Sequence, residues 1–219
     1  MATKQKWVIF GDNEYAITMI FETLYAIHKK SLEISIVINR KFTPQHPWNE
    51  DLHHIAMVNE EDFKADRPVF AFLAGMSPDS RQFLWKRFDK DRDNIVLPSL
   101  IHPSVVLPHH ITIEEGVRIE PNVTIAPYVS VGKAALINRG AIIGHHTTIG
   151  DFVNINPGAI INGMCHIGAH ATIGAGTIIN DGVVIGSHCV IGSGSLVTKN
   201  IPDHTIAYGS PAKVINTHS

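Results

Sequence analysis

The chain of 219 residues is 44% hydrophobic and carries a formal net charge of −2, so it suits one or two globular domains and offers no basic excess for nucleic acid. It has no apolar run near the roughly 20 residues that a membrane span needs, and its start, MATKQKW, lacks the apolar stretch of a signal peptide. These features predict a cytoplasmic protein without a membrane span or a nucleic-acid partner. Cys165 and Cys189 are expected to be small buried thiols rather than a disulfide or metal ligands.

The first hundred residues alternate apolar strands with helical periodicity. Strands are predicted at residues 7–10, 34–38, 69–74 and 95–97, and helices at residues 14–29 and 77–88. This order is typical of a small parallel α/β sheet of the Rossmann-like kind, whose ligands bind at the carboxyl ends of the strands. Those ends carry residues 11–15, 39–40 and 75–76.

A six-residue repeat follows without a break. Every sixth residue from Ile101 to Val197 is Ile, Leu or Val, at all seventeen positions, and a small or β-branched residue usually stands four residues later. A hexapeptide period indicates a parallel β-helix, because it suits a short strand and a corner with one large and one small residue pointing inward. Three such sides form a coil of 18 residues, so residues 101–197 make five to six coils. An antiparallel sandwich would need longer alternating runs.

The two patterns predict two domains. Residues 1–98 form a small Rossmann-like α/β domain, and residues 99–219 form a β-helix of hexapeptide repeats with a C-terminal tail.

This order of domains resembles the bacterial sugar acyltransferases that use acetyl-CoA, including N-acetyltransferases for nucleotide-linked 4-amino sugars and sialic acid O-acetyltransferases. The resemblance covers nearly the whole chain, with residues 100–103 (LIHP) at the domain junction and residues 209–213 (GSPAK) in the tail. It implies a left-handed winding, although parallel crossovers are generally right-handed. It also implies a homotrimer with active sites in clefts between neighbouring prisms, acetyl-CoA as co-substrate, and no metal.

The resemblance places a general base in residues 143–150, IGHHTTIG. His145 matches the catalytic His of the family motif, and an imidazole suits proton removal near neutral pH. Many relatives carry Asp or Glu at the next position, where this chain has His146 as a second candidate catalytic residue. An imidazole supplies no negative charge, so either an acidic residue reaches in from elsewhere or the base works unaided. The two adjacent histidines are not expected to hold one metal ion.

Three further residues are implied to act on the acceptor and the acetyl group. Asn138 matches an Asn near the acceptor amino group, and Asn154 stands where some relatives place a second His near the acetyl carbonyl. Gly163 lies one coil beyond His145, where its backbone N–H is expected to receive the thioester oxygen.

The CoA site is implied to run along the later coils. Ala175 and Ser193 are small residues that would flank pantetheine, and Lys213 in the tail would lie near the CoA phosphates. The structural alternative for the tail is a turn with a solvated lysine.

The predicted nucleotide-sugar pocket comprises Gly11, Asn13, Asn39, Arg40 and Gly75. The turn after the first strand departs from the family pattern, because relatives have Gly-His at residues 14–15 and this chain has Glu-Tyr. Two carboxylates in that turn would repel a diphosphate, which usually needs free N–H groups at a helix start. The domain therefore binds a different nucleotide, uses Arg40 for charge, or serves mainly as a structural lobe.

The leading hypothesis is an acetyl-CoA-dependent N-acetyltransferase that acts on a nucleotide-linked amino sugar in surface glycan synthesis. The alternatives are an O-acetyltransferase that acts on a sugar hydroxyl, and a non-catalytic hexapeptide binding module.

Overall fold

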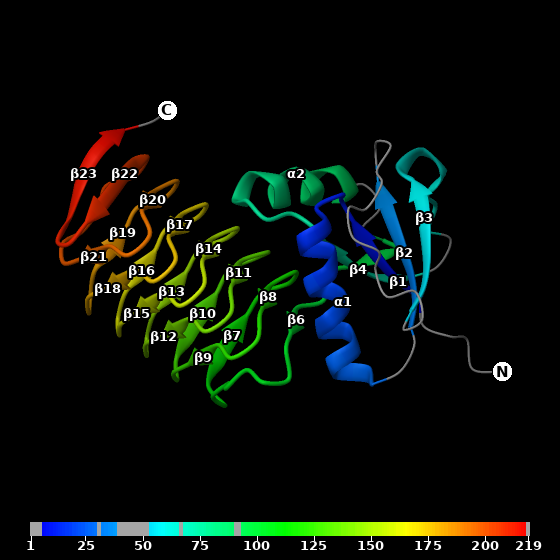
Figure 1. Cartoon of the computed structure of the whole chain (residues 1–219), viewed down its shortest axis with the longest axis horizontal. Coiled ribbons are helices and arrows are strands. Elements are labelled where there is room, and N and C mark those ends of the chain that lie inside the picture. Colours follow the sequence, from blue (N-terminus) through cyan, green and yellow to red (C-terminus); the bar gives the residue numbers. More distant parts are fainter. Residues whose placement is uncertain (1–5, 30–31, 39–52, 66–67, 90–92, 218–219) are drawn as a thin grey trace. The chain divides into compact units, whose positions relative to one another are not determined.

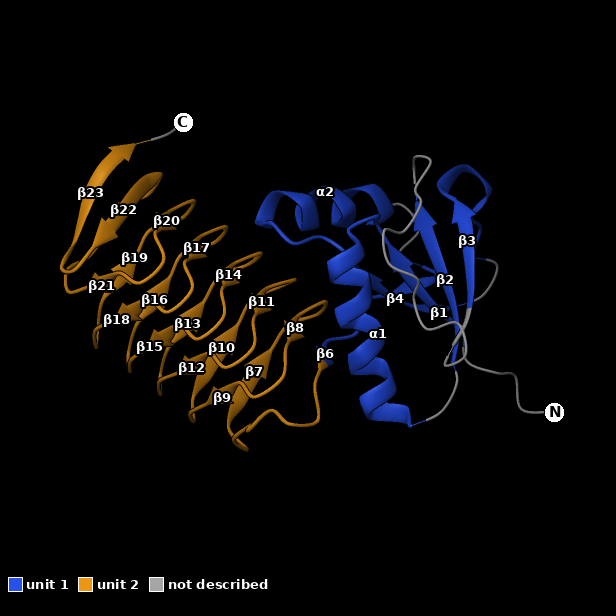
Figure 2. Ribbon diagram, viewed as in Figure 1, with its two compact units in different colours: residues 1–100 blue, residues 101–219 orange. Residues whose placement is uncertain are grey.

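The structure is a computed structural model that describes residues 6–29, 32–38, 53–65, 68–89 and 93–217. The chain divides into two compact units, residues 1–100 and 101–219 (Figure 2). The predicted fold class is confirmed: an α/β sheet unit is followed by a left-handed parallel β-helix built from hexapeptide repeats.

Unit 1 is a five-stranded parallel sheet with the strand order β3-β2-β1-β4-β5. Its elements are β1 (Lys6–Phe10), α1 (Glu14–His28), β2 (Leu32–Ile38), β3 (His53–Asn59), the 3₁₀ turn η1 (Glu60–Asp62), β4 (Val69–Leu73), α2 (Pro78–Phe88) and β5 (Ile95–Val96). The central strands are buried and the inner side of α1 packs on them, with Ile9, Ile17 and Ile34 fully buried. This burial on both faces explains the continuous apolar runs of the strands.

Local caps fix the two helix starts beside the carboxyl ends of β1 and β4. The Ala16 N–H donates to Asn13 Oδ1 at 2.9 Å. Ser77 and Ser80 form a reciprocal capping box in front of α2, and Pro78 occupies its first turn, where a missing N–H does no harm.

Strand β3 was not predicted. It is an edge strand that pairs only with β2 in the described sheet, and Ala56, Met57 and Asn59 are exposed. An edge strand that buries little has no strong apolar pattern, so the sequence carried a weak signal for it.

Unit 2 is a three-sided β-helix (Figure 1). We name its sides by the strands that stack on them: face I holds β6, β8, β11, β14, β17, β20, β22 and β23; face II holds β9, β12, β15, β18 and β21; face III holds β7, β10, β13, β16 and β19. The strands are β6 (Leu100–Ile101), β7 (Ile111–Ile113), β8 (Arg118–Ile119), β9 (Thr124–Ile125), β10 (Val129–Val131), β11 (Leu136–Ile137), β12 (Ile142–Ile143), β13 (Thr148–Ile149), β14 (Asn154–Ile155), β15 (Ile160–Ile161), β16 (His166–Ile167), β17 (Thr172–Ile173), β18 (Ile178–Ile179), β19 (Val184–Ile185), β20 (Val190–Ile191), β21 (Leu196–Val197), β22 (Thr205–Gly209) and β23 (Ala212–Thr217).

The 18-residue coil is visible in the strand register. Ile137 pairs with Ile155, Ile155 with Ile173, and Ile173 with Ile191, each across a parallel ladder. These aliphatic columns and the small residues between them form one continuous buried core. The predicted inward register is therefore correct from Val117 to Val197.

Leu107, in the first coil, was predicted to point inward but is 39% exposed, whereas Val105, Ile111 and Ile113 of the same coil pack against the core. Next to Leu107 the strand pairing with the following coil is an isolated bridge between Val106 and Thr124, and none of the described strands stacks below it on face II. An aliphatic side chain in a terminal coil lacks the neighbour that would cover it.

The corners between faces place residues in the left-handed backbone region at intervals of six. The corner between faces I and II uses Asn122 and then Gly140, Gly158, Gly176 and Gly194, all with positive φ. The corner between faces II and III uses Tyr128, His146 and Met164, which are not glycines, and then Gly182. Side chains at this second corner therefore stand on a backbone whose conformation is fixed by the coil rather than by the residue type.

The C-terminal tail forms an antiparallel hairpin of β22 and β23, added to the end of face I. The turn holds Ser210 and Pro211, and Lys213 is exposed on β23. The hairpin was not predicted from the sequence, because the exposed valine and isoleucine residues of β23 give no alternating pattern.

Candidate active site

Unit 1 contains a pocket of about 440 Å³ at the carboxyl ends of β1, β2 and β4. Its lining includes the predicted residues Gly11, Asn13 and Gly75, together with Glu60 and Phe83. The other two predicted residues, Asn39 and Arg40, lie outside the described residues. Phe83, on the exposed side of α2, was missed because an exposed aromatic residue carries no positional signal.

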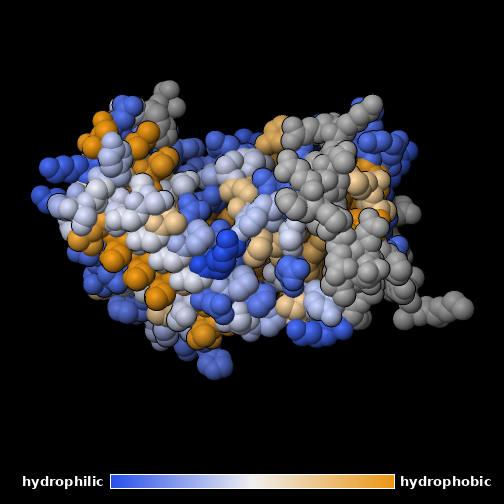
Figure 3. Space-filling model, viewed as in Figure 1, coloured by the Kyte–Doolittle hydropathy of each residue, from blue (hydrophilic) through white to orange (hydrophobic). Residues whose placement is uncertain are grey.

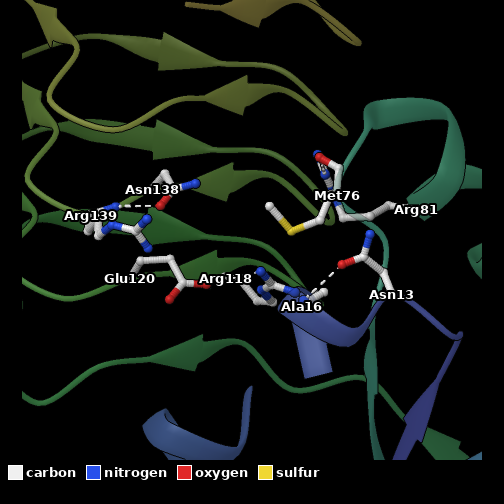
Figure 4. A network of polar contacts seen from close by, with 8 residues as sticks. All are labelled: Asn13, Ala16, Met76, Arg81, Arg118, Glu120, Asn138 and Arg139. Atoms are coloured by element: carbon white, nitrogen blue, oxygen red, sulfur yellow. Dashed lines mark hydrogen bonds and ion pairs between the residues drawn. The ribbon is translucent and has the colours of Figure 1, made fainter. Parts of the chain in front are cut away.

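Gly75 is required by the close approach of α2. A Cβ on residue 75 would lie 2.8 Å from the Arg81 nitrogen and 2.8 Å from Ser80 Oγ. The Arg81 side chain is buried and donates from Nη1 to the Met76 carbonyl at 3.2 Å (Figure 4). The loop after β4 is thus held tightly against the start of α2.

The helix starts and charges at this pocket do not suit the binding of a diphosphate. The N–H groups of Ala16, Ser77 and Ser80 already donate to side-chain oxygens, and Pro78 has no N–H. Two acidic residues, Asp12 and Glu60, line the pocket, and Glu60 forms an ion pair with Arg87. This arrangement favours hydrogen-bonding and apolar parts of a ligand over a highly charged anion.

In unit 2, His145 lies at the corner between faces II and III, two residues after β12. Its ring packs against Gly163, one coil further on, so closely that a Cβ on Gly163 would lie 2.8 Å from Nε2. The ring is exposed to solvent. His145 can therefore present a nitrogen to a ligand at the surface of the β-helix.

His146 turns its ring back toward His145. The two Nδ1 atoms are 3.1 Å apart, and the ring planes stand at 86°. Neighbouring side chains on a regular strand point to opposite sides. The left-handed backbone of His146, with φ of 56°, allows the pair to meet.

Gly163, the predicted oxyanion donor, has a partner for its backbone N–H. This N–H donates to Asp181 Oδ1 at 2.9 Å, so it is already engaged in this structure. Lys133 and Asp151 form the same contact at an equivalent spacing, which indicates a recurring structural link between coils. Asp181 was missed by the sequence reasoning, although its distance of 18 residues from Gly163 was a usable signal.

Asn138 lies at the corner between faces I and II, and its side chain is buried. Its Oδ1 accepts from the Arg139 N–H at 2.9 Å (Figure 4). One coil earlier, Arg118 Nη2 donates to Glu120 Oε1 at 3.0 Å, and both side chains of this ion pair are buried. The sequence analysis missed this pair, because charged residues in a strand are usually expected to face solvent.

The remaining predicted residues lie on face I or its borders. Asn154 stands between the inward residues Val153 and Ile155, so it points to the outer side of face I, where it is buried. Ala175 and Ser193 follow Asn138 along the same corner, one residue before the open glycines Gly176 and Gly194. Lys213 is exposed on β23.

A single chain therefore does not bring all of these residues together. His145, His146 and Gly163 share the corner between faces II and III, whereas Asn138, Ala175 and Ser193 share the corner between faces I and II. The width of face II separates the two groups.

Other chemistries find little support in the described part of the chain. No group of three or more His, Cys, Asp or Glu side chains there could hold a metal ion. Cys165 and Cys189 are buried and free. Burial raises the pKa of the Cys165 thiol, and nearby Asp181 raises it further, against the lowering effect of backbone hydrogen bonds from Val183 and Gly182. None of the described helices has the length and apolarity to cross a membrane.

A family model described as "Bacterial transferase hexapeptide (six repeats)" matches residues 164–199. No curated protein matches the chain at a significant level.

Solved structures resemble the chain over nearly its whole length. A variant of perosamine N-acetyltransferase from Caulobacter crescentus, in complex with CoA and GDP-perosamine, is 24% identical with a TM-score of 0.79, and the match covers 98% of both chains. The acetyltransferase domain of PglB from Neisseria gonorrhoeae, in complex with acetyl coenzyme A, is 21% identical with a TM-score of 0.83, covering 97% of this chain and 100% of that one. WeeI from Acinetobacter baumannii is 21% identical with a TM-score of 0.79, covering 96% and 100%. At these identities the likeness shows a shared fold.

Proposed function

We propose that the protein is an acetyl-CoA-dependent N-acetyltransferase whose acceptor is a nucleotide-linked amino sugar used in surface glycan synthesis. The observation that carries the proposal is the exposed imidazole of His145, packed on Gly163 at a corner of a β-helix. That fold is shared end to end with an N-acetyltransferase crystallised with CoA and GDP-perosamine.

His145 is the proposed general base. The acceptor amine attacks the thioester carbonyl carbon, a C–N bond forms, and the amine loses a proton to His145 Nε2. The C–S bond then breaks, and the CoA sulfur leaves as a thiolate that takes up a proton. The oxyanion of the intermediate needs a donor, and Gly163 N–H serves only if the Asp181 carboxylate turns away from it.

A second copy of the chain is the proposed source of the other half of the site. Face II, which separates the two groups of residues, carries an outward column of Ile142, Ile160, Ile178 and Leu196, one residue on each successive coil. Ile142 and Ile178 are 45% and 38% exposed. In the space-filling view, hydrophobic residues form rows along unit 2 (Figure 3). A partner on face II would cover this column and bring its own Asn138 corner toward His145; the resemblance implies a homotrimer.

The corner between faces I and II suits the extended part of CoA. A Cβ built on Gly158, Gly176 or Gly194 would have no neighbour within 4 Å, and the adjacent Ala175 and Ser193 are small. A thin, flexible chain such as pantetheine can run along an edge that lacks large side chains. Lys213 on the hairpin would supply positive charge for the CoA phosphates, and Asn154 would donate to the acetyl carbonyl.

The pocket of unit 1 is the proposed acceptor site, with residues 1–98 as the acceptor domain and residues 99–219 as the acyltransfer domain. Gly11, Asn13 and Gly75 would contact the nucleotide, and Asn39 and Arg40 are the candidates for charge complementarity. Asp12 and Glu60 suit donors on a base or ribose better than a diphosphate.

The test is acetyl transfer itself. The protein is incubated with acetyl-CoA and a panel of UDP- and GDP-linked amino sugars, and the released CoA thiol is measured with a chromogenic disulfide. We expect turnover with at least one amino sugar and none with its hydroxyl counterpart. Acetylation of a sugar hydroxyl alone would overturn the amine assignment. Failure to bind acetyl-CoA in calorimetry would overturn the enzyme class.

A further inference from the structure

The two imidazoles of His145 and His146 form one hydrogen-bonded unit. Their Nδ1 atoms are 3.1 Å apart, and a neutral imidazole carries its proton on only one nitrogen. One Nδ1 must therefore donate while the other accepts. The direction of this bond decides whether His145 Nε2 carries a proton or a lone pair.

The surrounding coils hold both rings. The His146 N–H donates to the Pro127 carbonyl at 3.2 Å, and the Met164 N–H donates to the His145 carbonyl at 2.7 Å. The His146 ring lies 4.8 Å from the Tyr128 ring, which stacks on His110 at 5.3 Å. The His145 ring rests on Gly163. The backbone hydrogen bonds and ring contacts of this corner thus hold the two imidazoles in place.

The residues around the pair do not supply a charged partner for either imidazole. Tyr128 and His110 line the His146 side, and Asp181, on the coil beyond Gly163, binds the Gly163 N–H. Neither imidazole forms an ion pair within the described part of the chain. The partner of His145 Nδ1 is therefore an imidazole instead of a carboxylate.

We propose that His145 and His146 work as a neutral imidazole dyad, in which His146 is a positioning residue that accepts the Nδ1 proton of His145 and so leaves His145 Nε2 bare. The inference rests on the proposed function, because it assumes that His145 is the base. When Nε2 takes the proton of the acceptor, the His145 Nδ1–H bond to His146 becomes charge-assisted and shorter. His146 thus supports the imidazolium without supplying a negative charge.

Imidazole nitrogen NMR on the intact protein tests the dyad without any substrate. At high pH we expect His145 to carry its proton on Nδ1 and His146 on Nε2. In His146→Leu, which offers no acceptor, His145 should lose its preference for a proton on Nδ1. A proton on His145 Nε2 at high pH in the wild-type protein, or an unchanged His145 tautomer in His146→Leu, would overturn the proposal.

Kinetics provide a second readout, with a conservative rescue. Asn tolerates the left-handed backbone and offers an acceptor oxygen, whereas Leu offers none. We expect His146→Leu to lower kcat by about 10–100-fold with little change in KM, and His146→Asn to stay within about threefold of wild type. His188→Leu is the matched control, because His188 has the same left-handed backbone and a stacked ring but lies on another corner. Equal losses in His146→Asn and His146→Leu would contradict the positioning role.

The two hypotheses fail in different ways. If no acceptor is acetylated, the proposed function is lost, yet the NMR tautomers still decide whether His145 donates to His146. If acetylation depends on His145 while the resting His145 carries its proton on Nε2, the function stands and the dyad does not.

Discussion

His145 and Gly163 are in direct contact across two successive coils, and the glycine has no room for a Cβ because His145 Nε2 would lie 2.8 Å from it. We expect Gly163→Ala to displace the imidazole and to lower kcat by about 10–100-fold, since positioning errors of this size are costly in catalysis. Stability should change little, because the obstructing atoms belong to an exposed side chain that can rotate.

Gly144→Ala is the matched control for that experiment. A Cβ there would lie 2.4 Å from the Asn162 carbonyl carbon, so backbone must move and the protein should lose thermal stability. Thermal melts and turnover of both variants separate the two effects. A large drop in melting temperature for Gly163→Ala would show that the His145 side chain cannot rotate away from the added Cβ.

Removal of the proposed base should affect chemistry alone. We expect His145→Ala to lower the turnover of acetyl transfer by roughly 10²–10⁴, the usual contribution of a general base. CoA affinity in calorimetry and the melting temperature should stay near wild type, because the ring is exposed. Turnover within threefold of wild type at saturating substrate would rule out the assignment.

Neighbouring residues in one strand of the β-helix differ sharply in burial. Ile185 is fully buried and Val184 is 39% exposed. Ile185→Asp would bury a carboxylate among stacked isoleucines, at an effective cost of several kcal/mol in the free energy of unfolding. Val184→Asp should be nearly neutral. Chemical denaturation of both variants checks the register, and equal stability would show that it is wrong.

The face II column can be tested by charge. Ile160→Glu together with Ile178→Glu should leave the secondary structure intact, because both side chains point outward, but should dissociate the proposed homotrimer and abolish turnover. Light scattering and circular dichroism measure the two outcomes. An unchanged molar mass in the double variant would show that the subunit interface does not lie on face II.

Cys165 should resist alkylation in the folded protein. Burial raises the pKa of its thiol, so the reactive thiolate is scarcer than in an ordinary cysteine at pH 8. Above the ordinary range of about 8.5 the unfolded chain loses this proton while the folded chain keeps it, so this group lowers stability as pH rises. Mass spectrometry after iodoacetamide treatment, with and without urea, measures the protection. Labelling of Cys165 at the rate of a free thiol without urea would contradict it.

The repeat made the β-helix predictable, because a column such as Ile137, Ile155 and Ile173 appears in the sequence as a fixed spacing. Elements at the edges were harder to predict from the sequence. Strand β3 buries little, and Leu107 lies in a terminal coil with no strand below it on face II. The contact between His145 and His146 could not be read from spacing, since it depends on the left-handed backbone of His146. The engagement of Gly163 N–H by Asp181 was open to prediction, because it repeats the contact between Lys133 and Asp151 at the same spacing of 18 residues.

The hairpin at the end of face I has a consequence for self-association. Coils stack by parallel pairing, and β22 still pairs in parallel with β20, but β23 reverses direction. The outermost strand of that sheet also follows Pro211, which lacks an N–H, and carries Lys213. Such features discourage an open sheet edge from recruiting another molecule. The reversal therefore acts as a stop against fibre growth, because a coil of a second molecule would meet an antiparallel edge.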